Sequence, residues 1–128
     1  MKLFVYGTLQ DAYPRQGLRR LAAERGLAVE LLGPATTAGL IYDLGAFPAL
    51  TPGSGIVHGE LFDVPDELIP RIDEYEGTPH HYTRRPITAT FADGSAFEAW
   101  AYFIVTPPPA SRRIASGNWL EHKKGQQR

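Results

Sequence analysis

The chain has 128 residues, of which 43% are hydrophobic and 21% are charged, and its formal net charge is −1 at pH 7. This length and composition fit one ordinary globular domain with a core of its own. The near-neutral charge gives no reason to expect nucleic acid or an anionic membrane as partner, and the lack of cysteine excludes disulfides, thiol catalysis and cysteine-bound zinc.

The N-terminal residues predict a buried strand followed by a turn. Residues 3–6 form a continuous apolar run that ends at Gly7. This run is too short for a signal peptide or a membrane span, so we expect a cytoplasmic protein.

The next segments alternate between helical and extended patterns. Leu18, Leu21 and Ala22 share one face of a predicted helix, and the strands that follow are separated by glycine and proline. The stretch before the last of these strands is rich in Gly, Pro and Ser and is expected to be a loop. The predicted ranges are a helix at 14–25, strands at 29–32 and 38–42, a loop at 43–55 and a strand at 56–64.

A second helix is predicted at residues 65–77, and its apolar face ends in a carboxylate. Leu68, Ile72 and Glu76 follow one another at a spacing of four, directly before Gly77. Pro70 removes an internal hydrogen bond, so the first turn is expected to be separate or irregular. A buried carboxylate is costly without a partner and is a natural general base, which makes Glu76 the residue to explain.

The last third of the chain predicts a hairpin. Residues 83–91 and 96–105 are rich in β-branched and aromatic side chains and flank a turn. A short segment begins at residues 117–119, and the polar tail at 121–128 is expected to be disordered. We therefore expect an α+β, mostly β fold: one domain at residues 1–120 with about six strands in a barrel-like sheet and two flanking helices.

Each candidate for chemistry has a simpler structural interpretation. A glycine after a buried strand can aim backbone N–H groups at an anion, or it can be an ordinary turn. Glu76 can act as a base, or it can pair with Arg84 or Arg85. Asp73, three residues earlier, could share a proton with Glu76 or bond locally.

Two other site classes find little support. The histidines, including the adjacent His80 and His81, lack metal-ligand spacing, so no metal site is expected. No serine lies in a nucleophile-elbow pattern, which disfavours a serine hydrolase.

Six ordered blocks make the chain resemble the γ-glutamylcyclotransferase-like superfamily, in its small-protein branch with γ-glutamylamine cyclotransferases and AIG2-like proteins. They include a Tyr-Gly-Thr-Leu turn and an Ile-Asp-Glu-Tyr-Glu-Gly block that resembles the Leu-Asp-x-x-Glu-Gly block of the family. The blocks lie at residues 4–9, 39–48, 59–62, 72–77, 82–84 and 101–119.

The resemblance implies a compact β-barrel whose cavity lies between the Tyr-Gly-Thr-Leu turn and a catalytic glutamate. It implies Glu76 as the acid/base residue, a small-molecule γ-glutamyl substrate, no cofactor and 5-oxoproline as product. The implied substrate-binding residues are Tyr6, Gly7, Thr8, Leu9 and Tyr82.

The chain also departs from the family pattern. Some eukaryotic γ-glutamylcyclotransferases have a substrate-contacting tyrosine after the proline-rich stretch, and this chain has Ser111 there. Two alternatives to an enzyme stay open: an inactive small-molecule-binding protein on the same fold, and a partner-binding domain. The sequence leaves the released amine and the oligomeric state undetermined.

Overall fold

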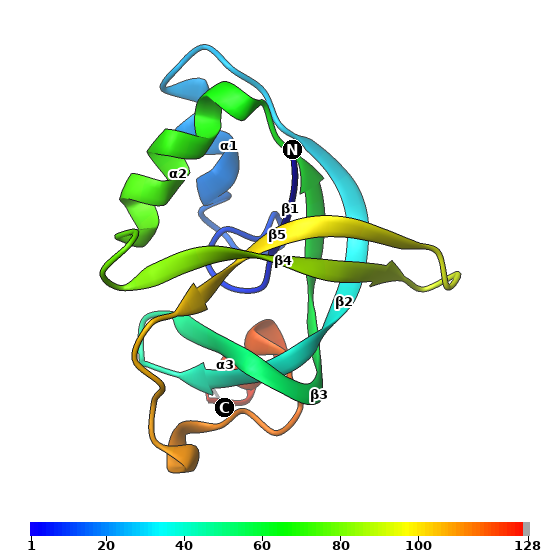
Figure 1. Cartoon of the computed structure of the whole chain (residues 1–128), viewed down its shortest axis with the longest axis vertical. Coiled ribbons are helices and arrows are strands. Elements are labelled where there is room, and N and C mark those ends of the chain that lie inside the picture. The colour runs from blue at the N-terminus through cyan, green and yellow to red at the C-terminus, as the bar shows by residue number, and fades with distance from the viewer. Residues whose placement is uncertain (127–128) are drawn as a thin grey trace.

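Five β-strands close into a barrel in the order β1-β3-β2-β4-β5 (Figure 1). The structure is a computed structural model and describes residues 1–126. The β1–β5 contact is parallel, and the other strand pairs are antiparallel. The elements are β1 (Lys2–Val5), α1 (Gly17–Ala23), β2 (Glu30–Asp43), β3 (Pro48–Asp63), a 3-10 turn (Asp66–Leu68), α2 (Ile69–Glu76), β4 (Tyr82–Phe91), β5 (Ala96–Ile104), a second 3-10 turn (Ala110–Arg112) and α3 (Trp119–Gln126).

The α+β barrel is confirmed, but it has five strands instead of six because β2 is one continuous strand where two were predicted. The two strands predicted at 29–32 and 38–42 are a single strand, since a register shift near Gly33 absorbs the expected break. The predicted loop at 43–55 is wrong except for residues 44–47. Pairing passes from Ala38 opposite Ile56 to Leu40 opposite Thr51, so the Gly- and Pro-rich residues form an irregularity within β3.

Strand β1 is buried on both sides because it separates two apolar clusters. Leu3 and Val5 pack into the cluster that holds α1 and α2 against the barrel. Phe4 belongs to a second cluster that draws on all five strands and on α3. Figure 1 shows α1 and α2 together on one side of the barrel and α3 at its other end.

Helices α1 and α2 differ in detail from their predicted bounds. Helix α1 starts at Gly17, later than expected, because Gln16 lies in the left-handed region with a φ of 46°. The expected irregular first turn before α2 is confirmed: a 3-10 turn precedes the helix, and Pro70 lies in the first turn of α2. Gly77 ends α2 with a φ of 70°, a left-handed conformation that favours glycine. No helix within residues 1–126 is long and apolar enough to cross a membrane.

Helix α3 lies where the disordered tail was predicted, so that prediction is wrong for residues 121–126, while 127–128 lie outside the described part. Its first residue, Trp119, is 1% exposed and packs into the barrel cluster. The Asn118 side chain accepts a hydrogen bond from the N–H of Glu121 and caps the helix. This tertiary packing gives order to a polar segment whose own composition predicts none.

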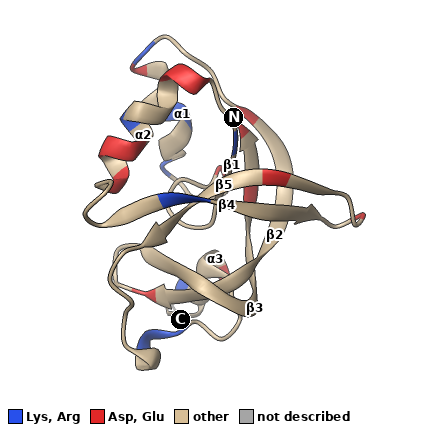
Figure 2. Ribbon diagram, viewed as in Figure 1, with Lys and Arg blue, Asp and Glu red and all other residues tan. Residues whose placement is uncertain are grey.

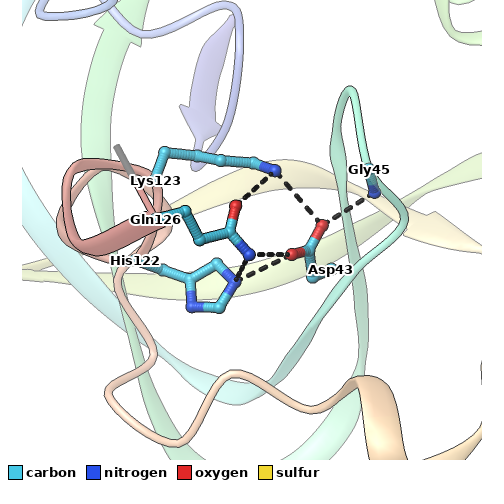
Figure 3. A network of polar contacts seen from close by, with 5 residues as sticks. All are labelled: Asp43, Gly45, His122, Lys123 and Gln126. Atoms are coloured by element: carbon cyan, nitrogen blue, oxygen red, sulfur yellow. Dashed lines mark hydrogen bonds and ion pairs between the residues drawn. The ribbon is translucent and has the colours of Figure 1, made fainter. Parts of the chain in front are cut away.

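The polar side of α3 is fastened to the buried carboxylate of Asp43 (Figure 3). His122 Nε2 lies 2.8 Å from Asp43 Oδ2, Gln126 donates to the same oxygen at 3.0 Å, and Lys123 Nζ is 3.4 Å from Oδ1. Asp43 also accepts the N–H of Gly45 at 2.7 Å. Burial alone would raise the pKa of Asp43, but these hydrogen bonds and the Lys123 charge hold it well below its usual range.

Replacing Trp119 by alanine is expected to destabilise the barrel, because it removes a fully buried indole from the core. Trp119→Ala should lower the free energy of unfolding by about 3–5 kcal/mol, measured by urea unfolding. Lys124→Ala, at an exposed position of the same helix, is the matched control and should change it by about 0.5 kcal/mol or less. Equal effects of the two substitutions would contradict this role of Trp119.

Candidate active site

A cavity of about 860 Å³ opens beside α2, where the two apolar clusters meet. Its wall is formed by the turn after β1, by α1, by the segment at 44–48, by α2 and by the ends of β4 and β5. The structure brings all the predicted site residues to this one cavity, although their roles in binding and catalysis stay predictions. The residues concerned are Tyr6, Gly7, Thr8, Leu9, Glu76 and Tyr82.

The turn after β1 is tight and closely packed. The carbonyl of Gly7 accepts the backbone N–H of Gln10 at 3.1 Å. A Cβ at Gly7 would lie 2.6 Å from the ring of Pro48, so this close approach requires glycine. Within residues 1–126, the N–H groups of Thr8 and Leu9 have no hydrogen-bond acceptor. Two backbone donors of this turn are therefore unpaired within the described chain, and both residues line the cavity.

Glu60, which the sequence pattern did not single out, bonds to the backbone of the residues that follow this turn. It is buried on β3 and accepts the backbone N–H of Asp11. Burial raises the pKa of Glu60, although the hydrogen bonds from Asp11 and Ala12 act against that rise. Asp11 in turn pairs with Arg19 of α1 at 2.6 Å. Glu60 lies in the block at residues 59–62, but within a predicted strand at 56–64 nothing in the sequence indicates that this carboxylate is buried.

Two tyrosines form the inner wall, and their hydroxyl groups bond to backbone carbonyls. Tyr6 donates to the carbonyl of Tyr102 at 2.6 Å, and Tyr82 donates to the carbonyl of Pro48 at 2.8 Å. Burial, and then the nearby Glu76 carboxylate, raises the pKa of both Tyr6 and Tyr82. Both phenols are therefore neutral, and their hydrogens are engaged in holding the wall together.

Glu76 lies in the last turn of α2 and lines the cavity. Among the residues that the structure describes, its carboxylate has neither a hydrogen-bond donor nor an ion-pair partner. Burial raises the pKa of Glu76 from 4.5 to about 7. The alternative pairings do not form: Arg84 pairs with Asp73, and Arg85 lies over the ring of Phe103.

Asp73 is a structural carboxylate and does not share a proton with Glu76. It accepts two hydrogen bonds from Arg84, at 2.7 and 3.1 Å, and one from the Tyr102 hydroxyl at 2.7 Å. Burial acts to raise the pKa of Asp73, but these bonds lower it below its ordinary value. Two carboxylates three residues apart thus have opposite pKa shifts, and Glu76 is the one that can exchange protons near neutral pH.

Other predicted features lie away from the cavity. Ser111, the departure from the family pattern, is exposed in the second 3-10 turn and does not line the cavity. Within the described chain, no three His, Asp or Glu side chains are grouped closely enough to hold a metal ion.

Comparison with known proteins decides the family. The family model described as "Gamma-glutamyl cyclotransferase, AIG2-like" matches residues 3–121. The chain belongs to this family. It is 29% identical over 125 residues to the γ-glutamylcyclotransferase family protein YtfP of Escherichia coli K12. The matched region covers 97% of this chain and 100% of YtfP.

Solved structures share the fold of this family member. A crystal structure of an AIG2-like protein from Mus musculus matches with a TM-score of 0.72 and 25% identity, over 84% of this chain and 79% of that one. YkqA from Bacillus subtilis matches with a TM-score of 0.76 and 23% identity, over 98% of this chain but only 42% of YkqA. The second likeness shows the fold alone.

The raised pKa of Glu76 should make the stability depend on pH in a specific window. The unfolded carboxyl ionises near pH 4.5 and the folded one near pH 7, so folding binds a proton between these values. The free energy of unfolding should therefore fall as pH rises from 4.5 to 7, by up to about 3 kcal/mol from this group.

Urea unfolding of wild type and Glu76→Gln across this pH range measures the effect. The variant should lose this component of the pH dependence, while Glu67→Gln, at an exposed position before α2, should keep it. Identical pH dependence in wild type and Glu76→Gln would contradict the raised pKa.

Proposed function

We propose that this protein is a γ-glutamylcyclotransferase that converts a γ-glutamyl amine or γ-glutamyl amino acid into 5-oxoproline and releases the amine. The observation that carries the proposal is the position of Glu76: a half-buried carboxylate, unpaired within residues 1–126, whose pKa desolvation raises to about 7, in one cavity with the turn at residues 6–9. A base whose pKa lies near neutrality is suited to proton transfer in both directions.

The reaction needs protons moved between two nitrogens of the substrate. Glu76, as carboxylate, takes a proton from the α-ammonium group, and the freed amine attacks the side-chain carbonyl carbon. Glu76 then gives the proton to the leaving nitrogen, and the bond between that nitrogen and the carbonyl carbon breaks. The ring nitrogen loses a second proton, which also ends on the released amine, so no water is consumed.

The remaining groups of the cavity have a positioning role in this proposal. The nucleophile and the electrophile belong to one molecule, so the protein has to hold the substrate in a folded conformation. The N–H groups of Thr8 and Leu9, which have no acceptor within the described chain, are donors suited to a carboxylate or to the oxygen that gains charge during the attack. The engaged tyrosine hydroxyls support a rigid wall.

Glu76→Gln should abolish 5-oxoproline release because the amide cannot accept the α-ammonium proton. We expect a loss of at least about 100-fold in kcat across a panel of γ-glutamyl amines and dipeptides, measured by chromatography of 5-oxoproline. Glu67→Gln is the control and should retain wild-type rates. A turnover rate in Glu76→Gln equal to that of the wild type would refute the mechanism. Substrate binding without turnover by the wild-type protein would support an inactive binding protein.

The activity should also depend on the ionisation of Glu76. Because the base must be ionised to accept a proton, kcat/KM should fall about tenfold per pH unit below a midpoint near pH 7. Initial rates from pH 5 to 8 at low substrate concentration measure this limb. A midpoint close to 4.5, the ordinary glutamate value, would contradict the role of burial.

A further inference from the structure

Beyond the Glu76 region, the cavity wall carries cations that the protein itself does not neutralise. Arg15 and Arg20 line the cavity, are exposed, and have no carboxylate within 4 Å in the described part of the chain. The third arginine of the wall, Arg71, differs because it lies 3.4 Å from both Glu24 and Glu74. Figure 2 shows basic segments of the ribbon on α1 and both basic and acidic segments on α2. Two cations are thus left to attract an anionic group.

The same cavity has two exposed aromatic side chains from different elements. Phe47 is 45% exposed on the loop between β2 and β3, and Tyr75 is 49% exposed on α2. A single exposed aromatic residue needs no explanation, but two that line one cavity form an apolar surface for a ligand.

The loop that carries Phe47 is fixed from behind. The Leu44 N–H donates to the Phe47 carbonyl at 3.1 Å, which closes the loop into a turn. The Asp43 carboxylate accepts the Gly45 N–H within this turn and is itself held by α3 (Figure 3). The aromatic side chain is therefore presented from an anchored turn, as a preformed binding wall requires.

We propose that the leaving group is an amino acid with a bulky apolar side chain, so that the substrate is a γ-glutamyl dipeptide such as γ-glutamyl-phenylalanine. Arg15 and Arg20 attract its carboxylate, while Phe47 and Tyr75 contact its side chain. A leaving group that carries a positive charge, such as a diamine, is disfavoured by the same two arginines. This inference rests on the proposed cyclotransferase function and names its substrate class.

The reaction balances without a further reactant. The α-nitrogen of the glutamyl residue forms a bond to the γ-carbonyl carbon, and the bond from that carbon to the phenylalanine nitrogen breaks. Both protons lost by the α-nitrogen end on the released phenylalanine, which leaves as a zwitterion beside 5-oxoproline.

A series of three substrates separates the two recognition elements. γ-Glutamyl-phenylalanine carries both the ring and the carboxylate, γ-glutamyl-alanine lacks the ring, and γ-glutamyl-phenethylamine lacks the carboxylate. We expect kcat/KM to fall about tenfold on loss of the ring and about fivefold on loss of the carboxylate. Added salt should reduce the second difference, since the arginines are exposed.

Paired variants assign these differences to residues. Arg15→Gln combined with Arg20→Gln should reduce the preference for γ-glutamyl-phenylalanine over γ-glutamyl-phenethylamine about fivefold, whereas Arg25→Gln, an exposed arginine outside the cavity, should not. Phe47→Ser should reduce the preference for the phenylalanine over the alanine substrate, and Ile56→Ser is its exposed control.

Calorimetry with the Glu76→Gln variant measures the binding of the same three compounds without turnover. These affinities separate the dipeptide preference from the proposed cyclotransferase function. Turnover of all three substrates with equal kcat/KM would overturn the dipeptide preference and leave the cyclotransferase intact. Selective binding of γ-glutamyl-phenylalanine with no turnover by the wild type would support the ligand class and refute the enzyme.

Discussion

The ion pair between Asp73 and Arg84 determines which groups surround the carboxylate of Glu76, one turn further along α2. Because Arg84 donates to both oxygens of Asp73, it is not available to Glu76. Tyr102 completes the set of donors around Asp73. Glu76 is then left with burial as the dominant influence on its pKa, and burial favours the protonated form. One helix thus carries a carboxylate whose pKa is lowered by its donors and another whose pKa is raised to about 7.

Pro48 connects the walls of the cavity. Its ring approaches Gly7 so closely that no side chain fits there, and its carbonyl accepts the hydroxyl of Tyr82. The turn after β1, the start of β3 and the start of β4 therefore meet at one residue. Proline suits this position because its ring packs while its carbonyl remains free to accept a hydrogen bond.

The sequence predicted the α+β barrel but not its continuous hairpin or its third helix, and it selected residues that the structure places in one cavity. Glu76 was recognisable because a carboxylate ended an apolar stripe, and the turn at residues 6–9 because a glycine followed a buried strand. The continuous hairpin was missed, since glycine and proline normally end strands and only the partner strand shows that they form irregularities. Helix α3 was missed because its order comes from tertiary contacts: Trp119 packs into the barrel cluster, and His122 bonds to Asp43, 79 positions away. Glu60 and Phe47 depend on tertiary position in the same way.

The hydrogen bond from Tyr6 to the carbonyl of Tyr102 joins residues 96 positions apart. This contact, like the parallel pairing of β1 with β5, can form only once the N-terminal strand has met the last strand of the barrel. Forming this contact closes a loop that includes most of the chain. The conformational entropy of that loop is lost before the contact adds to stability. The cavity wall therefore cannot be complete until the last strand is in place, and chains still emerging during synthesis hold Glu76 without a finished site around it.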